Sequence, residues 1–375
     1  MKVMVVAGAR PNFMKIAPVV AELERRGHET VLVHTGQHYD TSMSQSFFDD
    51  LGIRPPDHFL GVGGGSHAAQ TARIMERFEP VLLEAKPDWV LVPGDVNSTL
   101  GASLVTVKLK TQLGTQLAHL EAGLRSHDWR MPEEINRVLT DRCSDLLLTP
   151  SRDAHANLAA EGIDEDRVHF VGNVMIDTLL LRLDAARERD YAGTLGLERD
   201  GYVAATLHRP SNVDEAGPLR VCLEALARIA EKMPVVLPMH PRTRQRAEAF
   251  GFGDLLSGIT ATEPLGYLEM LSITDGARVM LTDSGGLQEE TTVLGVPCVT
   301  LREQTERPIT IEQGTNRLAP WPLTVDGIIA SFEEALAQPR RPVGENCPEG
   351  WDGRASERLV GALESVRMPA VAVGA

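Results

Sequence analysis

The chain has 375 residues, 43% of them apolar, and 52 acidic against 37 basic residues give a formal net charge of −15. This length exceeds one ordinary hydrophobic core and predicts two domains. The acidic balance disfavours nucleic acid or an anionic membrane as the main partner, so an anionic substrate has to be met by locally placed cations.

Cysteine usage and the N-terminus indicate the class of protein. The four cysteines have no C-x-x-C spacing, so the sequence predicts neither a zinc site nor a disulfide framework. Met1-Lys2 and the few apolar residues before Arg10 are typical of a first β-strand rather than a signal peptide. No run approaches the ~18 apolar residues of a membrane span. We therefore expect a cytoplasmic protein that holds no metal.

Strand-like runs alternate with helical patterns in the first half of the chain. The runs are nearly continuous and rich in Val and Leu, as expected of parallel strands buried on both faces. Helices are predicted over Phe13–Arg26, before Gly27, and over Met175–Arg189, and the polar segment Asp190–Asp200 is interpreted as the inter-domain connection. The predicted strands are Lys2–Ala7, Thr30–His34, Trp89–Val92, Gln116–Leu120, Leu146–Leu148 and Val168–Val171.

The same alternation restarts after Asp200. Helices are predicted over Leu219–Lys232 and Tyr267–Ile273, and a last helix over Ala355–Val366. Repeated strand–helix units predict an α/β fold with two doubly wound parallel sheets. The predicted strands are Tyr202–Leu207, Val235–Met239, Val279–Thr282 and Cys298–Leu301.

The most informative stretch is Asp283-Ser284-Gly285-Gly286-Leu287-Gln288-Glu289-Glu290, between a predicted strand and a short helix that ends near Gly295. Two glycines let the backbone approach a ligand, and the N–H groups at the start of a helix form an anion site. A carboxylate one turn into the helix can then accept hydrogen bonds from a ribose diol. The stretch fits a nucleotide-diphosphate site, and it equally fits a plain turn followed by a solvated acidic helix face.

Polar residues follow six of the predicted strands. Because ligands bind at the carboxyl ends of strands in doubly wound sheets, these residues favour one shared cleft. The first half supplies carboxylates, and the second half supplies His and Arg around the glycine turn. This predicts a diphosphate on the second domain and acid–base chemistry on the first. The residues are Arg10 with Lys15, Asp95, Glu121, His208 with Arg209, His240, and the turn at Ser284.

Met131-Pro132-Glu133-Glu134 is typical of a helix start, with Pro in the first position and acids in the first turn. Acids there need no catalytic reason, so Glu133 and Glu134 both stay candidates. Glu133 and Arg137 are expected to pair at i, i+4. The chain has no Walker A motif, and no G-x-G-x-x-G follows the first strand, so neither a P-loop nor a nicotinamide cofactor is inferred.

Taken together, these motifs resemble the UDP-N-acetylglucosamine 2-epimerase family and occur in family order over about residues 1–320. They are Ala9-Arg10-Pro11 with Lys15, Thr35-Gly36-Gln37-His38, Gly94-Asp95, His119-Leu120-Glu121-Ala122-Gly123-Leu124-Arg125, Pro132-Glu133-Glu134-x-Asn136-Arg137, His208-Arg209, Leu281 to Glu290, and Thr305-Glu306-Arg307-Pro308.

The resemblance implies a GT-B-like fold, with two Rossmann-like domains and the active site in the cleft between them. The first domain is expected at 1–172, joined by a C-terminal helix within 355–375, and the second, UDP-binding domain at 173–354. The family is also associated with homodimers and with the biosynthesis of cell-surface polysaccharides.

Family chemistry implies a cofactor-free isomerase of the non-hydrolysing type. It removes the C2 proton of UDP-N-acetylglucosamine and expels UDP, and UDP then adds back to the 2-acetamidoglucal to give UDP-N-acetylmannosamine. The implied catalytic residues are Asp95, Glu121, Glu133 and His208. The implied substrate-binding residues are Arg10, Lys15, Arg137, Arg209, His240, Ser284, Gly285, Gly286, Glu290 and Arg307. A possible allosteric site for a second substrate molecule comprises Gln37, His38 and Arg73.

Three positions depart from the pattern of many family members, namely Ala9, Asn12 and Pro93, and they leave the sugar-side details open. Three other functions remain as alternatives: a hydrolysing 2-epimerase that releases free N-acetylmannosamine and UDP, a GT-B glycosyltransferase, and a catalytically silent nucleotide-sugar binder. Three candidate carboxylates in the first domain argue against the transferase, which usually needs one base.

Overall fold

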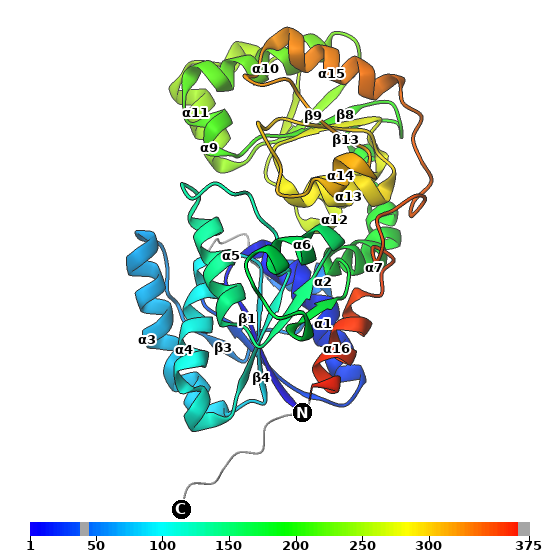
Figure 1. Cartoon of the computed structure of the whole chain (residues 1–375). Coiled ribbons are helices and arrows are strands. Elements are labelled where there is room, and N and C mark those ends of the chain that lie inside the picture. Colours follow the sequence, from blue (N-terminus) through cyan, green and yellow to red (C-terminus); the bar gives the residue numbers. More distant parts are fainter. Residues whose placement is uncertain (38–44, 367–375) are drawn as a thin grey trace, which may run out of the picture. The chain divides into compact units, whose positions relative to one another are not determined.

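The computed structural model describes residues 1–37 and 45–366. The chain forms two compact units, each built on a parallel sheet (Figure 1). Unit 1 comprises Met1–Thr178 and the C-terminal segment from Glu349, and unit 2 comprises Leu179–Pro348.

Unit 1 contains a seven-stranded parallel sheet in the order β3-β2-β1-β4-β5-β6-β7. Lys2 of β1 pairs with Glu29 on one side, and Val3 pairs with Trp89 on the other. The strand order therefore reverses between β1 and β4, the point at which doubly wound sheets bind ligands. The strands are β1 (Lys2–Ala7), β2 (Glu29–His34), β3 (His58–Phe59), β4 (Trp89–Pro93), β5 (Gln116–Leu120), β6 (Leu146–Thr149) and β7 (Val168–Phe170).

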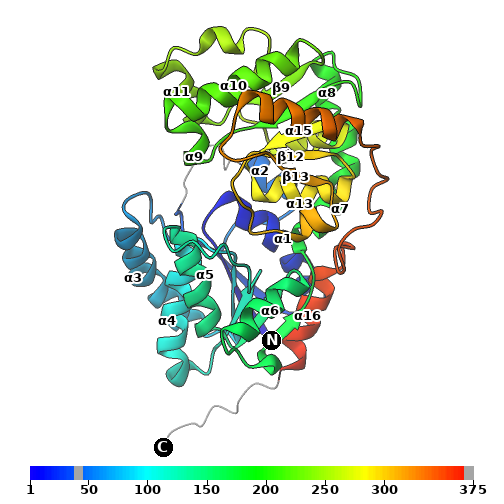
Figure 2. The ribbon, with the colours of Figure 1, turned by 45° about the horizontal axis from the view of Figure 1, so that its top comes forward.

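Helices cover the sheet of unit 1. Met4 and Val6 of β1 pack with Phe78 of α3 and Val105 of α4 in one apolar cluster. Helices α3, α4 and α5 lie side by side (Figure 2), and α16 lies along α1. The helices are α1 (Arg10–Arg25), α2 (Gln45–Leu51), α3 (His67–Ala85), α4 (Asn97–Leu113), α5 (Pro132–Cys143), α6 (Arg152–Ala160) and α16 (Ala355–Ser365), with the short 3-10 helix η1 (Glu165–Arg167).

Unit 2 contains a six-stranded parallel sheet in the order β10-β9-β8-β11-β12-β13. This is the strand order of the dinucleotide-binding α/β fold, and it reverses between β8 and β11. The core joins Val203 and Ala205 of β8 to Leu223 of α10 and Phe332 of α15. The strands are β8 (Val203–Thr206), β9 (Val235–Pro238), β10 (Thr260–Thr262), β11 (Val279–Thr282), β12 (Cys298–Thr300) and β13 (Asn316–Leu318).

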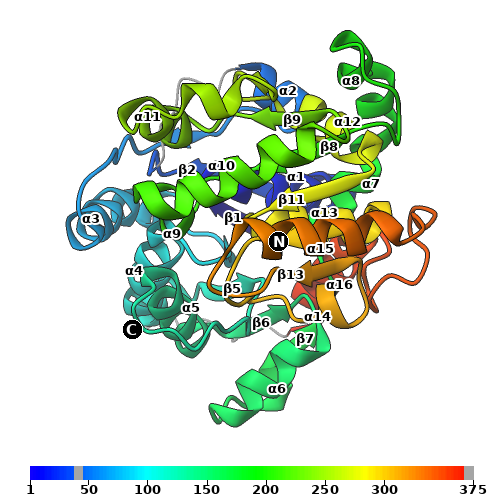
Figure 3. The same ribbon diagram turned by 90° about the horizontal axis from the view of Figure 1, so that it is seen from above.

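The helices of unit 2 include the pair α10 and α15, which lie side by side (Figure 3). No helix in residues 1–37 and 45–366 combines the length and the apolar character needed to cross a membrane. The helices are α8 (Tyr191–Thr194), α9 (Pro210–Val213), α10 (Ala216–Ala230), α11 (Pro241–Ala249), η2 (Gly253–Leu256), α12 (Tyr267–Gly276), α13 (Gly285–Leu294), α14 (Ile309–Glu312) and α15 (Val325–Ala337).

The prediction of two doubly wound parallel sheets is confirmed. Three predicted strands match β1, β5 and β11 at both ends, namely Lys2–Ala7, Gln116–Leu120 and Val279–Thr282. The sequence analysis missed β3, β10 and β13, which are edge strands of two or three residues that lack a continuous apolar run.

The interpretation of Asp190–Asp200 as the inter-domain connection is wrong. This segment lies inside unit 2, where it forms α8 and its Tyr191 N–H donates to Ser272 Oγ at 3.1 Å. The chain instead passes from unit 1 to unit 2 within α7 (Val174–Arg189). Thr178 Oγ1 donates to the Met14 carbonyl of unit 1 at 2.6 Å, whereas Arg187 pairs with Asp275 of unit 2 at 2.9 Å.

Candidate functional site

The glycine turn of unit 2 forms the start of α13. Ser284 is the N-cap, its N–H donates to Thr282 Oγ1 at 2.9 Å, and Gly295 ends the helix with a φ of 70°. The first N–H groups of a helix, here those of Gly285 and Gly286, lack intrahelical partners and lie at the positive end of the helix dipole. The predicted strand-to-helix turn with anion-binding geometry is therefore present.

Arginine side chains surround this turn. A Cβ at Gly285 would lie 2.7 Å from Arg307 Nη1, so glycine is required for the guanidinium to approach the helix start. Arg307 Nε donates to Glu289 Oε1 at 2.7 Å, which orients it. Burial lowers the pKa of Arg209, and the nearby Arg302 lowers it further. The buried Arg209 Nε has no hydrogen-bond partner among the described residues, so the guanidinium, which lies near the charges of Glu306 and Asp283, can still donate to a bound anion.

Asp283 directly follows β11 and binds the two residues that lie just beyond the end of β8. It is fully buried and accepts hydrogen bonds from the N–H groups of His208 and Arg209 at 3.0 and 2.9 Å. His208 Nδ1 lies 2.7 Å from Asp283 Oδ1, which leaves Nε2 as the nitrogen available to a ligand. Burial alone would raise the pKa of Asp283, but the hydrogen bond and charge of His208 bring it below its usual range. The His240 ring lies next to His208, with 5.9 Å between centroids.

Glu289 and Glu290 of α13 are 2% and 4% exposed, so the alternative of a solvated acidic helix face is wrong. Burial, followed by the charge of Glu289, raises the pKa of Glu290 to about 8. Within the described residues the Glu290 carboxyl accepts no hydrogen bond. A buried carboxyl without an internal donor is suited to a ligand hydroxyl.

In unit 1, the ends of β1, β4 and β5 bring Lys15 and Glu121 into a buried ion pair. Gly94 has a φ of 65° and packs directly against this pair. A Cβ at Gly94 would lie 3.1 Å from Lys15 Nζ and 3.3 Å from Glu121 Oε2, so a side chain there would crowd the pair. Glu121 itself has a φ of 71°, a strained conformation for a residue with a side chain. Arg10 begins α1, and its Cζ lies 5.1 Å from the ring centroid of Phe47.

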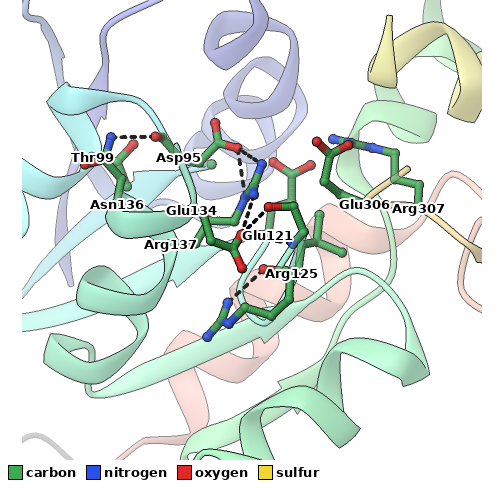
Figure 4. A network of polar contacts seen from close by, with 12 residues as sticks. Asp95, Thr99, Glu121, Arg125, Glu134, Asn136, Arg137, Glu306 and Arg307 are labelled. Atoms are coloured by element: carbon green, nitrogen blue, oxygen red, sulfur yellow. Dashed lines mark hydrogen bonds and ion pairs between the residues drawn. The ribbon is translucent and has the colours of Figure 1, made fainter. Parts of the chain in front are cut away.

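Arg137 of α5 pairs with two carboxylates, Asp95 after β4 and Glu134 in the first turn of α5. Its Nη2 lies 2.6 Å from Asp95 Oδ2 and its Nη1 lies 2.7 Å from Glu134 Oε2 (Figure 4). The predicted pair of Arg137 with Glu133 is therefore wrong. Glu134 also accepts from the N–H groups of Ser126 and His127 at 3.0 and 2.9 Å, which fixes the loop before α5. Glu134 is a structural carboxylate, and Glu133 is left as the candidate for chemistry.

A pocket of about 240 Å³ lies in unit 1. It is lined by Gln37, Gly64, Gly65, His67, Gln70, Asp95, Val96, Asn97, Pro132, Glu133 and Asn136, so it brings Asp95, Glu133 and Gln37 together. Arg73 lies outside the lining and donates from Nη2 to the Gly64 carbonyl, which holds the glycine loop. His38 lies outside the described residues. Within those residues, no cluster of three or more His, Cys, Asp or Glu has a metal-binding arrangement.

The model of the UDP-N-acetylglucosamine 2-epimerase family matches residues 21–364. The chain belongs to this family. The UDP-N-acetylglucosamine 2-epimerase of Methanocaldococcus jannaschii is 42% identical over 327 residues, which cover 85% of this chain and 88% of that protein. The UDP-2,3-diacetamido-2,3-dideoxy-D-glucuronate 2-epimerase of Pseudomonas aeruginosa is 44% identical over 323 residues, with 85% and 88% coverage.

The crystal structure of the M. jannaschii UDP-GlcNAc 2-epimerase in complex with UDP-GlcNAc and UDP matches with a TM-score of 0.87. It is 39% identical and covers 97% of this chain and 99% of that one. The family resemblance and the GT-B-like class of the two α/β units are thereby confirmed.

The sequence analysis assigned no role to several residues that shape these sites. Asn136 donates to the backbone carbonyl of Asp95 at 2.9 Å and lines the pocket, although its motif was recognised. Asn212 donates to Asp283 at 3.1 Å from α9. Asn12, a departure from the family pattern, accepts from the N–H groups of Gly8 and Ala9 at 3.2 and 3.1 Å. Only the spacing of Asn136 to Glu133 offered a signal in the sequence.

Proposed function

We propose that this chain is a non-hydrolysing UDP-N-acetylglucosamine 2-epimerase, an isomerase that interconverts UDP-N-acetylglucosamine and UDP-N-acetylmannosamine. The observation that carries the proposal is the buried Arg209 guanidinium, whose Nε has no partner among the described residues, close to Arg307, which approaches the start of α13. These cations and the helix N–H groups suit a diphosphate. A family member 39% identical to this chain was crystallised with UDP-GlcNAc and UDP.

The proposed reaction balances without an oxidant or a reductant. A base removes the C2 proton, the electron pair forms the C1=C2 double bond, and the bond between C1 and the UDP oxygen breaks. UDP then adds back to C1 of the 2-acetamidoglucal while an acid returns a proton to the opposite face of C2. Carboxylates are suited to both proton transfers, and cations stabilise the departing diphosphate.

Unit 2 is proposed to bind UDP. The N–H groups at Ser284, Gly285 and Gly286 and the side chains of Arg209 and Arg307 contact the diphosphate. Glu290 accepts hydrogen bonds from the ribose hydroxyls, a role consistent with its buried carboxyl that lacks a donor. His208, oriented by Asp283, supports the leaving oxygen, and His240 beside it contacts the substrate.

Unit 1 is proposed to supply the acid–base groups Asp95, Glu121 and Glu133. Lys15 pairs with Glu121, and Arg137 pairs with Asp95, so a cation lies beside each of these two carboxylates. Arg10 completes the cationic side of the substrate site. Gln37 and Arg73 are proposed to belong to a second-ligand site that borders the pocket.

The proposed setting is a cytoplasmic homodimer that supplies a sugar for cell-surface polysaccharides. All four cysteines are free, which suits a reducing compartment.

Ile135 and Leu139, one turn apart on α5, are 37% and 43% exposed and offer an apolar surface for a second copy. Light scattering on a sizing column would give twice the chain mass, and a monomer at all concentrations would contradict the dimer.

Substitutions of the proposed acid–base carboxylates test the chemistry. Asp95→Asn, Glu121→Gln and Glu133→Gln should each lower kcat by about 10²-fold or more, because each removes a proton-transfer group. Glu76→Gln on the exposed face of α3 is the matched control and should retain full activity. UDP affinity, measured by calorimetry, should stay near wild type in all variants. Full activity in the three variants would contradict the proton-transfer roles of these carboxylates, whereas a wild-type protein that binds UDP without turnover would be a nucleotide-sugar binder.

Two other functions predict different products. Free N-acetylmannosamine that accumulates in step with UDP would indicate the hydrolysing reaction. Turnover without deuterium entering C2 from D2O would indicate a glycosyltransferase. The second candidate substrate is a UDP-2,3-diacetamido-glucuronate, favoured by the 44% identical relative that carries that name. A higher kcat/KM for it than for UDP-N-acetylglucosamine would decide in its favour.

A further inference from the structure

A group of charged residues, three of them buried and one exposed, connects the ends of β4 and β5 in unit 1. We call it the β4–β5 ion cluster, and its members are His119, Asp141, Arg125 and Glu161. His119 and Asp141 are fully buried. Asp141 on α5 pairs with Arg125 at 2.7 Å, and Arg125 Nε lies 2.6 Å from Glu161 at the end of α6. The proposed proton transfer uses none of these four side chains.

Both ring nitrogens of His119 face groups that only accept hydrogen bonds. Nε2 lies 2.7 Å from the Gly94 carbonyl oxygen, and a carbonyl cannot donate. Nδ1 lies 2.6 Å from Asp141 Oδ1. Asp141 Oδ2 faces two further donors, the Arg125 guanidinium at 2.7 Å and the Gly123 N–H at 3.1 Å, so Asp141 acts only as an acceptor. These contacts leave His119 to donate from both ring nitrogens.

The charges of the β4–β5 ion cluster balance when His119 carries both protons. Arg125 and His119 supply two positive charges, and Asp141 and Glu161 supply two negative charges. A neutral His119 would leave one acceptor without a donor in a fully buried place, which is costly. The local balance of charge thus agrees with the hydrogen bonds.

The cluster fixes both turns that carry proposed acid–base groups. The Gly94 carbonyl held by His119 belongs to the peptide that precedes Asp95. Asp141 Oδ2 accepts from the Gly123 N–H at 3.1 Å, at the end of the turn that begins with Glu121. The Gly94 N–H donates to the Leu120 carbonyl at 2.9 Å, which links the two turns directly.

We propose that His119 is a positioning residue of the epimerase reaction. As a buried imidazolium it holds the Gly94 carbonyl and Asp141 together, and so sets the places of the Asp95 and Glu121 carboxylates. This inference rests on the proposed function. Loss of one of its hydrogen bonds lets both turns shift, and misplacement of catalytic groups by about 1 Å can lower a rate by about 10²-fold.

The charge of His119 is tested without substrate. Nitrogen-15 NMR of the full chain with labelled histidine reports which ring nitrogens of each histidine carry protons, and His119→Asn assigns the signal. We expect both nitrogens of His119 to be protonated at neutral pH. A signal with one protonated nitrogen would show a neutral ring and overturn the inference.

Kinetics then test the positioning role. His119→Asn should lower kcat by about 10- to 100-fold while KM and the affinity for UDP stay near wild type. The matched control is Thr115→Val, which removes a buried hydrogen bond of 2.7 Å to the Pro87 carbonyl just before the other end of β5. The control should lose stability without losing kcat. Equal losses of kcat in both variants would reduce the role of His119 to stability and overturn the proposal.

The combined effect of two substitutions on kcat distinguishes a positioning role from a mere loss of stability. Asp141→Asn should lower kcat to a similar extent, and the pair His119→Asn with Asp141→Asn should cost little more than either change, because both break one unit. Multiplied losses would contradict the cluster. An inactive wild-type protein would overturn the proposed function and the catalytic part of this inference, whereas a neutral His119 in an active enzyme overturns the inference alone.

Discussion

Glu290 links the stability of the fold to pH in a direction opposite to that of most carboxylates. Its folded pKa is raised from 4.5 to about 8, first by burial and then by the charge of Glu289. A group whose pKa is raised on folding contributes most stability below its unfolded pKa, and the contribution is lost as pH rises towards the folded value. In this window the unfolded chain ionises Glu290 and the folded chain does not.

The size of the effect follows from the two pKa values. Each pH unit between 4.5 and about 8 lowers the free energy of unfolding by about 1.4 kcal/mol. At neutral pH the accumulated loss is about 3 kcal/mol, which is a large part of the stability of an ordinary domain. Glu290→Gln removes the ionisation and keeps the shape of the side chain.

Urea unfolding of the wild type and of Glu290→Gln at about pH 5 and about pH 8 measures this linkage. The variant should gain about 3 kcal/mol or more relative to wild type between the two conditions. Its UDP affinity should fall because the Gln amide offers the ribose hydroxyls one acceptor oxygen where the Glu290 carboxyl has two. Glu248→Gln on exposed α11 is the control and should show no such trend. A difference in stability between variant and wild type that stays constant with pH would show that folding does not raise the pKa of Glu290.

Two further substitutions address unit 2. Gly285→Ala places a Cβ 2.7 Å from Arg307 Nη1 and should raise the Kd for UDP in calorimetry by about 10- to 100-fold, the value of one hydrogen bond to a charged group; an unchanged Kd would contradict the diphosphate site. Asp275 pairs with Arg187, Arg199 and Arg340, and despite its burial these pairs lower its pKa to about 2. The stability that Asp275 contributes is present above its unfolded pKa and is lost as pH falls towards 2. Asp275→Asn should therefore lower the free energy of unfolding by about 2 kcal/mol at neutral pH. In the variant, the free energy of unfolding should also depend less on pH in the acid range. A wild-type acid dependence retained in the variant would contradict this assignment.

The regular part of the fold could be predicted because each unit repeats a local signal. Continuous apolar runs produced buried parallel strands, and residues after those runs produced the strand-end turns. The edge strands β3, β10 and β13 carry no such signal, since they are short and pair on one side. The change of unit inside α7 was also hidden, because a continuous helical pattern does not show which residues pack against which sheet.

The candidate site was predictable in its residue types and less so in their partners. The Ser284 turn follows from local chain chemistry, so it was recognised. The bond from the His208 N–H to Asp283 joins residues 75 positions apart and needs the sheet order. Which of Glu133 and Glu134 is the structural carboxylate depends on how the loop at Ser126 folds back on α5. Such contacts are set by tertiary packing, which one sequence does not display.

Proton NMR of UDP-N-acetylglucosamine incubated with the 375-residue chain in D2O decides between epimerisation and the other reactions. We expect UDP-N-acetylmannosamine to appear and deuterium to enter C2 of both sugars, while free UDP does not accumulate. Epimerisation without deuterium at C2, or no change in the substrate at all, would show that the proposed elimination and re-addition do not take place.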